Sequence, residues 1–552
     1  FNRLYSGHQL YGATNATLTA EEVFRQSADV DQELYTGISE LGNDVHDNTL
    51  RITGLGANGL SHFAAAGYTT GAAGDLTNNA LTLSSANALT IRNIYGGYAA
   101  NTASAAKVTG NSVTLTHGAL SADNVYGGYT AGSDKAESNK VLVTGGSVSL
   151  TPVVSSAISG AIYGGASVSG DAEKNEIDLH AVSVTGDVVG GQGTDAKDNT
   201  VTLRGTQISG TVYGGRLADG RTSAVVGNGN TLNIYDMGTK VGYFEPVEKL
   251  NFYLSEKADT TRSMLTTTQA KNKDLRGTTI TVELSGDHTP IHNGDVVKLV
   301  TLPNGNNLDI DSAYANQTYK TTQGVTLNYN YGLETRNTAS SSTVNRNELI
   351  ARVKSVSVSP QAKSLVETQS AALAFLASGS DLIVNVGIPA AEAAAAQIAD
   401  IVDAPFANSK NTDASKAPLS MLGSYQLFAA QSYGSARLKT GSYVDAKGWN
   451  LNVGFARRNE LSDSSLTFGP FVEYGSGSYD SYLDDGTHGD GKTDYLGVGI
   501  MAKVEKDSGT YYEGSLRVGR AKSDYSGTVE SRGTGYDTSS NYFAGHLGIG
   551  QK

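Results

Sequence analysis

Hydrophobic and polar residues alternate in short stretches between residues 48 and 235, and each stretch begins with an asparagine. Strict alternation over four or five residues predicts a short β-strand with one buried face. We therefore expect a run of similar strands. The stretches are Asn48-Thr-Leu-Arg-Ile, Asn79-Ala-Leu-Thr-Leu, Asn111-Ser-Val-Thr-Leu, Asn139-Lys-Val-Leu-Val, Asn175-Glu-Ile-Asp-Leu, Asn199-Thr-Val-Thr-Leu and Asn230-Thr-Leu-Asn-Ile.

A second motif, a β-branched residue followed by Tyr-Gly-Gly, recurs between these stretches. Paired glycines permit a sharp corner in the chain, so we expect the motif to mark corners of the repeat. The predicted corner residues are Tyr95, Gly96, Gly97, Tyr126, Gly127, Gly128, Tyr163, Gly164, Gly165, Tyr213, Gly214 and Gly215, with Val189-Gly190-Gly191 as a variant.

Successive asparagines are 31, 32, 28, 36, 24 and 31 residues apart, so the repeat varies in length while its two motifs stay constant. A unit of two short strands cannot bury its own apolar face, but stacked units bury a continuous core. This pattern predicts an all-β fold with a β-solenoid. A β-sandwich built from the same strands is the alternative, and the regular return of the Tyr-Gly-Gly motif favours the solenoid.

A different pattern begins at Ser359-Pro360, where apolar residues recur at helical spacing. Serine caps helices and proline suits the first helical position, so we expect a helix to start here. Gly379, Gly387 and Pro389 are expected to break it, and the Ala-rich stretch that follows predicts a second helix.

After residue 420 the alternating stretches become longer, at about 10 to 16 residues. Strands of soluble proteins usually have about 5 or 6 residues, whereas membrane barrels use strands of about 10. The pattern therefore favours a membrane barrel, with a soluble β-sandwich as the alternative. The predicted strands are 424–439, 447–457, 464–478, 493–505, 510–524 and 541–550.

The strands predicted over 447–457, 493–505 and 510–524 each have one apolar face and one polar or small face. In the strand over 510–524, for example, Glu513 and Arg517 share one face while Leu516 and Val518 share the other. In an outer-membrane barrel the apolar face meets lipid and the other face meets water. The predicted lipid-facing residues are Trp449, Leu451, Val453, Phe455, Leu496, Val498 and Ile500.

The connections between the long strands alternate in length. Residues 480–493 are rich in Asp and Gly and predict an exterior loop, whereas Lys506-Asp-Ser-Gly509 predicts a tight turn on the periplasmic side. The predicted organisation is the N-terminal part of the β region over 1–47, the repeats over 48–254, the end of the β region over 255–355, a helical linker over 359–402, a connecting segment over 403–420 and a partial barrel over 421–552.

Composition narrows the functional classes. The net charge of −13, with no basic run, lacks the electrostatic pattern of nucleic-acid-binding proteins. Cysteine is absent, which excludes disulfides, thiolate metal sites and cysteine nucleophiles. No run of about 18 apolar residues is present, so we expect no transmembrane helix and a membrane role would require a barrel.

Three segments resemble the translocator region of type V autotransporters of Gram-negative bacteria. They are Ser359-Pro-Gln-Ala-Lys-Ser-Leu, Gly379-Ser-Asp-Leu and Ser432-Tyr-Gly-Ser-Ala-Arg-Leu-Lys-Thr-Gly-Ser-Tyr-Val-Asp-Ala-Lys-Gly-Trp449. The Tyr-Gly-Gly repeats resemble the passengers of that family. The resemblance implies a right-handed β-solenoid passenger on the cell surface and a twelve-stranded outer-membrane barrel whose pore holds the linker helix. It also implies outer-membrane lipid, the barrel-assembly machinery and periplasmic chaperones as partners.

The sequence departs from this family at its two ends. Six barrel strands are expected instead of twelve, and the chain reaches Lys552 without the terminal aromatic residue typical of the family. It starts at Phe1 with neither Met nor a signal peptide. We therefore expect a fragment that lacks the N-terminal signal and the C-terminal half of the barrel, because open sheet edges in lipid leave backbone groups unsatisfied.

Candidate chemistry is sparse. Gly190-Gly-Gln-Gly-Thr-Asp195 fits part of a calcium-binding repeat but occurs once, and the acidic run over 484–490 is typical of a solvated loop. Asn408-Ser-Lys-Asn411 fits a self-processing site or an unstructured turn. The histidines, among them His117, His180, His288 and His292, have no metal-ligand spacing, and the nucleophile motifs of serine hydrolases are absent.

The function expected from these features is self-export of a β-solenoid that acts as an adhesin or a surface spacer, with a host or cell-surface ligand. We predict no catalytic residue, cofactor or metal. An enzyme passenger such as a glycan-acting hydrolase is one alternative, because paired carboxylates on a solenoid need no local motif. A soluble secreted β protein is the other.

Overall fold

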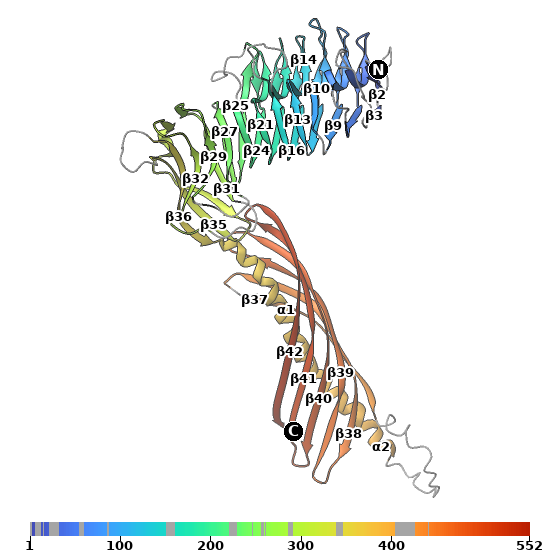
Figure 1. The fold of residues 1–552 in the computed structure, drawn as a ribbon. Helices are drawn as coiled ribbons and strands as arrows, with labels where there is room; N and C mark the ends of the chain where they lie inside the picture. The colour runs from blue at the N-terminus through green and yellow to red at the C-terminus, as the bar shows by residue number, and fades with distance from the viewer. Residues whose placement is uncertain are drawn as a thin grey trace. The chain divides into compact units, whose positions relative to one another are not determined.

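The chain forms two compact units, Phe1–Ser357 (unit 1) and Val358–Lys552 (unit 2). The boundary falls between the predicted β-rich region and the predicted helical linker. β-Strands dominate both units (Figure 1). The computed structural model describes residues 3–5, 13–14, 16–20, 33–54, 60–85, 88–116, 118–150, 160–219, 229–245, 247–254, 259, 261–284, 291–337, 346–402, 425–439 and 441–552.

In unit 1, corresponding strands of successive repeats lie side by side in parallel, so each repeat adds a strand to each of three sheets. The asparagine-led stretches form most of a 10-stranded sheet: β3 (Thr17–Ala20), β6 (Thr49–Ile52), β9 (Ala80–Ser84), β12 (Ser112–Thr116), β16 (Lys140–Thr144), β20 (Glu176–His180), β24 (Thr200–Arg204), β26 (Thr231–Tyr235), β28 (Lys249–Leu254) and β31 (Thr279–Leu284). A 7-stranded sheet contains β2 (Ala13–Thr14), β5 (Val45–His46), β8 (Leu76–Thr77), β11 (Val108–Thr109), β15 (Ala136–Glu137), β19 (Ala172–Glu173) and β23 (Ala196–Lys197).

The third sheet has 17 strands and contains the Tyr-Gly-Gly motifs. Its strands are β1 (Arg3–Tyr5), β4 (Glu33–Ser39), β7 (Leu60–Thr69), β10 (Leu89–Ala99), β13 (Ala119–Ala122), β14 (Asn124–Thr130), β17 (Ser147–Leu150), β18 (Ala161–Ser167), β21 (Ser183–Thr185), β22 (Asp187–Gly193), β25 (Gln207–Leu217), β27 (Thr239–Phe244), β29 (Ser263–Thr267), β32 (Val296–Thr301), β34 (Tyr319–Gln323), β35 (Leu327–Arg336) and β36 (Glu348–Val358). A small sheet pairs β30 (Lys273–Leu275) with β33 (Leu308–Ile310), and a 3₁₀ turn, η1, spans Ser312–Tyr314.

The core of unit 1 is a ladder of apolar side chains that repeats from strand to strand. Val113 of β12 lies beside Leu81 of β9 and Val141 of β16, and all three are at most 1% exposed. Their strand neighbours alternate to the outer face, which confirms the predicted two-residue period. Burial of each such side chain contributes about 1.5–3 kcal/mol to the free energy of folding, relative to leaving it exposed.

The parallel 10-stranded sheet ends at β31, whose outer N–H groups have side-chain partners. Ile280 and Val282 donate to the hydroxyls of Tyr314 at 2.7 Å and Tyr331 at 3.1 Å. Leu284 donates to Thr321 Oγ1 at 3.3 Å. These hydroxyls satisfy the edge of the sheet, which would otherwise pair with another strand.

Unit 2 begins with a helix that runs from a 3₁₀ turn, η2 (Pro360–Ala362), through α1 (Lys363–Leu382) and a π-helical segment (Ile383–Gly387) into α2 (Ile388–Val402). The Ser359 hydroxyl accepts from the Gln361 N–H, which confirms the predicted cap. The predicted break at Gly379 is wrong, because α1 continues through it. Before Pro389, which has no N–H to donate, the Ile388 N–H bonds to the Ile383 carbonyl and the helix widens instead of breaking.

This continuous helix changes one expectation from sequence. Among the described residues, one helical stretch, Pro360–Ala396, is long and apolar enough to cross a membrane. Core helices of soluble proteins can have the same length and apolar composition. The helix was missed because Gly and Pro suggested two shorter elements.

The rest of unit 2 is an antiparallel sheet in which each strand pairs with the next along the chain. Its strands are β37 (Gln426–Lys439), β38 (Tyr443–Glu460), β39 (Ser464–Tyr482), β40 (His488–Lys506), β41 (Thr510–Val529) and β42 (Arg532–Gln551). All six predicted strands are present, and most are longer than predicted. The loop predicted over 480–493 is shorter than expected, because β39 and β40 extend into it from both sides and leave only residues 483–487 as the connection. The predicted tight turn after Lys506 is confirmed, with Gly509 at φ +83°.

Candidate functional site

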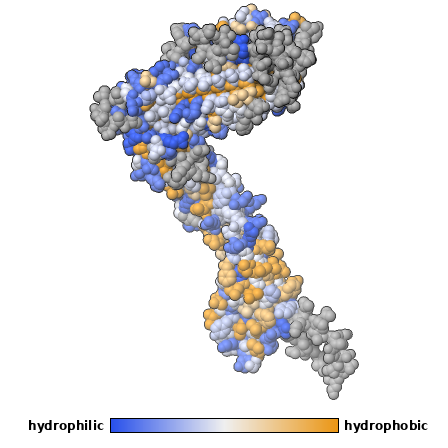
Figure 2. All heavy atoms as spheres, in the orientation of Figure 1, coloured by the Kyte–Doolittle hydropathy of each residue, from blue (hydrophilic) through white to orange (hydrophobic). Residues whose placement is uncertain are grey.

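The six-stranded sheet of unit 2 has one strongly apolar exposed face. Leu496, Val498 and Ile500 of β40 are 56–59% exposed on it, and all seven predicted lipid-facing residues lie there, with Leu451 and Val453 partly covered. Apolar residues gather over these strands in Figure 2. Leu516 and Val518, which the alternation had placed on the apolar face of their strand, lie beside Ile500 and Val498. Strand register adds further exposed members that sequence reasoning did not name: Val472, Phe543, Leu547 and Ile549.

The opposite face of the same sheet is polar and carries the helix. Ser364, Thr368, Phe375 and Gly379 belong to the buried side of α1, at the spacing of one helical stripe. The glycines of the sheet make room for this contact, since a Cβ on Gly448 or on its neighbour in β39 would overlap the Phe375 ring. Small residues in the strands therefore allow the helix to lie close to the sheet.

Near its N-terminal end the helix is held by hydroxyl groups. Ser364 Oγ lies 2.9 Å from Ser481 Oγ and 2.8 Å from the Tyr525 hydroxyl. Thr368 Oγ1 lies 2.9 Å from the Tyr479 hydroxyl. Because such buried polar groups are costly when unpaired, these contacts favour one placement of the helix.

Further along the helix, the contacts include charged groups. Asn450 donates to Ser378 Oγ at 2.9 Å, in the middle of the sheet. Lys503 Nζ donates to Glu392 Oε2 at 2.7 Å, and the two side chains are 7% and 16% exposed. Lys552 Nζ also reaches Glu392, at 2.9 Å. The polar face is thus matched to the helix along much of its length.

The family resemblance implied a helix inside the barrel, but sequence reasoning named no residue of this helix–sheet interface. The alternation correctly placed Glu513 and Arg517 in one phase of β41 and identified the face opposite the apolar one. It did not identify which helix residue meets which strand, because contacts between residues 72 or more positions apart leave no local pattern. The available signal was the polar stripe of Ser, Thr and Glu within an otherwise apolar helix.

The Tyr-Gly-Gly motifs of unit 1 lie within strands and not at corners. None of their glycines, all of which are described, has a positive φ. A Cβ on Gly97 would lie 2.7 Å from Asn111 Cγ, and one on Gly96 would overlap the Gly127 carbonyl. The glycines are needed for close approach. The corner prediction is therefore wrong for Tyr95, Gly96 and Gly97 in β10, Tyr126, Gly127 and Gly128 in β14, Tyr163, Gly164 and Gly165 in β18, and Tyr213, Gly214 and Gly215 in β25.

The close approach is made by the asparagine that opens each repeat. Asn111 donates from Nδ2 to Asn139 Oδ1 at 3.1 Å and to the Leu76 carbonyl at 2.9 Å, and its backbone N–H donates to the same Oδ1 at 3.0 Å. The asparagines are essentially inaccessible to solvent. Equivalent bonds join Asn48, Asn79, Asn111, Asn139, Asn175, Asn199 and Asn230 into one ladder. The two sequence motifs are therefore parts of one packing arrangement.

The tyrosines of the motifs stack along the same direction. The Tyr126 ring lies 5.1 Å from Tyr95 and 4.7 Å from Tyr163, with interplanar angles of 3° and 6°. Burial, together with the neighbouring tyrosines, raises the pKa of Tyr95 and of Tyr126. Arg216 donates to the Tyr163 hydroxyl at 2.6 Å. Because their faces are occupied by one another, these rings serve packing between repeats.

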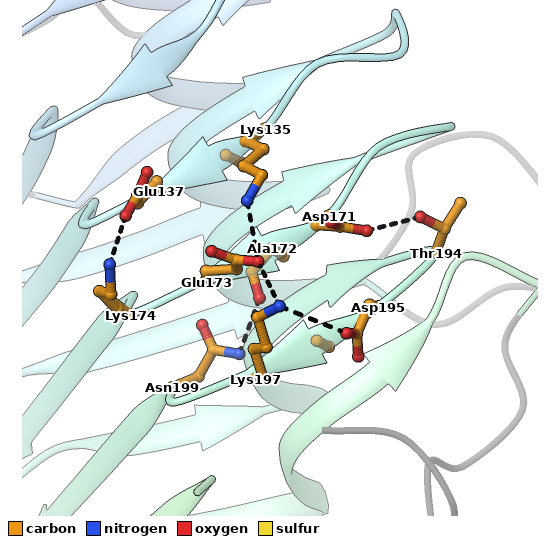
Figure 3. Close-up of polar contacts among 12 residues, drawn as sticks. Lys135, Glu137, Asp171, Ala172, Glu173, Lys174, Thr194, Asp195, Lys197 and Asn199 are labelled. Carbon is orange, nitrogen blue, oxygen red and sulfur yellow. Dashed lines mark hydrogen bonds and ion pairs between the residues drawn. The ribbon is translucent and has the colours of Figure 1, made fainter. Parts of the chain in front are cut away.

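Ion pairs link the strands of the 7-stranded sheet (Figure 3). Glu173 accepts from Lys135 at 3.0 Å and from Lys197 at 2.8 Å, and Glu137 accepts from Lys174 at 2.7 Å. Burial alone would raise the pKa of Glu173, but the hydrogen bonds from the two lysines outweigh it and lower the pKa. The charges thus join one repeat to the next.

The remaining candidates from sequence do not come together into a metal site among the described residues. The described residues contain no group of three or more His, Cys, Asp or Glu placed to bind a metal. Gly190-Gly-Gln-Gly193 belongs to β22, so the calcium-repeat resemblance falls on a strand. The Asp485 carboxylate accepts from the backbone N–H of Thr487 at 3.0 Å. His117, His288 and the Asn408-Ser-Lys-Asn411 segment, like residues 403–420 as a whole, lie outside the described residues.

No protein family, curated protein or solved structure matches the chain in comparisons with known proteins. The function therefore has to be argued from the two faces of the unit 2 sheet and from the ladders of unit 1.

Proposed function

We propose that the protein is a self-exporting surface protein of the autotransporter type, in which unit 2 is part of an outer-membrane barrel and unit 1 is its passenger. The observation that carries this proposal is the division of the unit 2 sheet into an exposed apolar face and a polar face that binds a helix. In water an exposed face of Leu, Val, Ile and Phe is unfavourable, whereas in a bilayer it is the required outer surface.

The helix supports the same proposal. Its sheet-facing side combines polar and small residues with a few large apolar ones, among them Phe375 and Ile383, and meets a sheet face of the same mixed kind. Such a mixed surface suits an element enclosed within a barrel. Its other side still exposes Val366 and Leu373, at 58% and 67%. Further strands that close the sheet around the helix would cover these side chains and pair the open edges of β37 and β42, which lipid cannot satisfy.

Unit 1 is proposed to be a β-solenoid passenger. Parallel pairing between corresponding strands of successive repeats, with one apolar ladder and one asparagine ladder, is what a stacked coil requires. Such a stiff rod can carry binding loops at its repeats, so we infer that it acts as an adhesin or surface spacer toward a host or cell-surface ligand. Absence of cysteine suits passage through a narrow pore, because the passenger carries no disulfide.

Placement in the outer membrane implies partners. The barrel would contact outer-membrane lipid on its apolar face. The barrel-assembly machinery and periplasmic chaperones would be needed to insert it, as in the autotransporters that the sequence resembles.

The test is to express the full-length protein in a Gram-negative host and measure surface accessibility of unit 1 to protease. We also expect heat-modifiable migration of unit 2 in detergent. Val498→Lys places a charge on the apolar face and is expected to cost about 2–4 kcal/mol in a bilayer and to reduce both signals. Ser476→Lys, between Trp449 and Asp494 on the same face, is the control.

The alternatives predict other outcomes. A soluble secreted β protein would fold without detergent, and Val498→Lys would leave its folding unchanged, which would contradict the proposal. An enzyme passenger would be recognised by turnover when purified full-length protein is incubated with glycans, esters and peptides. Turnover would replace the adhesin interpretation but not the export mechanism.

A further inference from the structure

A buried ion pair lies beneath the middle of the helix. Arg517 of β41 donates to Glu473 of β39 at 2.8 Å, and the two side chains are 4% and 0% exposed. The desolvation cost of such a pair is offset only when its remaining donors and acceptors are also satisfied. The partners of these remaining groups therefore show what the pair does.

The other groups of the pair connect it to the helix and to the next strand. Arg517 Nη2 donates to the Leu376 backbone carbonyl at 2.9 Å and also to the Ser380 hydroxyl. The other Glu473 oxygen accepts from the Tyr542 hydroxyl at 2.5 Å. Glu473 thus holds the guanidinium, and the guanidinium holds one turn of the helix.

At this level the helix has a notch, which is the space left by the missing side chain of Gly379. A Cβ on Gly379 would overlap the Tyr495 hydroxyl and would lie 3.3 Å from Arg517 Nη1. A shift of the helix by one residue combines a rise of about 1.5 Å with a rotation of about 100°, and it would put Ser378 or Ser380 in the place of Gly379, with a side chain where only hydrogen fits. The planar guanidinium also matches its partners in only one position.

We propose that Arg517, held by Glu473, is the positioning residue that fixes the axial position of α1 on the polar face of the sheet. The contact acts as a latch at Leu376, Gly379 and Ser380. Its consequence for permeability rests on the proposed function, in which the latched helix obstructs the pore of the closed barrel.

The absence of cysteine from the chain permits a direct test by cross-linking. Ser364→Cys and Ser481→Cys replace two hydroxyls that lie 2.9 Å apart, some four helical turns from the latch. The rate of disulfide formation under mild oxidation then reports whether the helix keeps its place in the full-length protein. The double variant Arg517→Met/Glu473→Met removes both charges, so that no carboxylate is left buried and unpaired, which would otherwise endanger folding.

We expect the double variant to cross-link about tenfold more slowly, which corresponds to about 1.4 kcal/mol of lost helix–sheet interaction. Arg517→Lys keeps the charge but not the planar fork, so its rate should be intermediate. Arg520→Met is the control, because Arg520 lies on the same strand and is exposed on the opposite face. A wild-type cross-linking rate in the double variant, with heat-modifiable folding retained, would overturn the latch.

Conductance in planar bilayers separates the latch from the proposed function. If the latch and the proposed function are both correct, the channel formed by the double variant opens more often than the channels formed by the parent protein and by Arg520→Met. Slower cross-linking without a channel in any of the proteins would support the latch and contradict the barrel. Wild-type conductance together with wild-type cross-linking in the double variant would contradict the latch alone.

Discussion

Units 1 and 2 use the same two-residue alternation but bury opposite faces. Val141 of unit 1 is 0% exposed, whereas Val498 of unit 2 is 56% exposed, although both lie in regular alternating strands. In unit 1 the polar face meets solvent and the apolar face meets the next sheet. In unit 2 the polar face has partners on a helix and the apolar face has none among the described residues. Alternation therefore defines two faces, and the partners of the polar side chains decide which one is inside.

The two units also differ in how they satisfy buried polar groups. Unit 1 repeats one asparagine from strand to strand, so every copy has the same partners. Unit 2 uses a different pair at each level of the helix, from Ser364 to Glu392. Because every repeat of unit 1 offers equivalent partners, each repeat can pair with the next in the same register. Because each level of the unit 2 sheet offers different partners, the helix has a single position in which all of them are satisfied.

The largest expected effect is a break in the asparagine ladder. Asn139→Ala removes the acceptor for two Asn111 N–H groups and the donor to the Val108 carbonyl and to Asn175. Each unsatisfied buried group costs about 1–3 kcal/mol, so we expect a loss of about 3–5 kcal/mol in the free energy of unfolding of unit 1. Hydrogen exchange of the β12 and β16 amides during denaturant titration measures it.

The control is Asn233→Ala, because that amide lies on the outer face of its strand and bonds only to side chains among the contacts of the described residues. Its expected cost is below about 1 kcal/mol. Equal losses for the two variants would show that the ladder contributes nothing beyond ordinary hydrogen bonds. Unit 2 helix contacts should be unchanged in both.

A smaller effect is expected from filling the glycine space that the ladder requires. A Cβ on Gly128 would lie 2.5 Å from Asn139 Cγ, whereas a Cβ on Gly434 of unit 2 would meet no atom within 4 Å. Gly128→Ala should destabilise unit 1 by about 1–3 kcal/mol through overpacking. Gly434→Ala should leave the thermal stability of unit 2 unchanged or slightly raised. Equal effects would mean that the glycines serve flexibility and not close packing.

Sequence predicted the strands well and their connections less well. Strict alternation located every asparagine-led strand and all six strands of unit 2, since side-chain period is a local property. Tyr-Gly-Gly was misinterpreted because glycine serves both turns and close packing, and only the partner of its second glycine, an asparagine 10 to 15 residues further along the chain, distinguishes them. The extensions of β39 and β40 were missed because Asp and Gly are typical of loops, although strand pairing can accommodate them.

The candidate site was less accessible from sequence. The phase of Arg517 was visible, but Glu473 is 44 residues away and Leu376 is 141 residues away. Such a contact depends on which strands adjoin and on where the helix lies. Ser359 and Pro360, by contrast, were identified correctly because a helix cap is formed by neighbouring residues.

Unit 1 is also expected to gain stability with rising pH because of Lys273. Burial lowers the pKa of Lys273 to about 7, against the opposing charges of Glu245 and Asp274, from 10.5 in the unfolded chain. Between these values the unfolded chain binds more protons, so stability rises with pH by at most about 1.4 kcal/mol per pH unit. Denaturant titrations at pH 7 and pH 9 measure this rise. Lys273→Met should abolish it, and exposed Lys271→Met should retain it.

The smallest expected effect comes from the ion pairs between repeats. The pKa of Glu173 is lowered below 4.5 by Lys197 and Lys135, so its contribution is present above that pH and is lost as the pH falls through the folded-state pKa. Glu173→Gln should cost about 1 kcal/mol at pH 7 and flatten the acid limb of the stability curve of unit 1. Glu176→Gln removes an exposed ion pair with Lys140, at 2.9 Å. It should change neither the stability of unit 1 at pH 7 nor the acid limb of its stability curve. If both variants behave alike, charge pairing between repeats adds nothing to the register that the asparagine ladder already imposes.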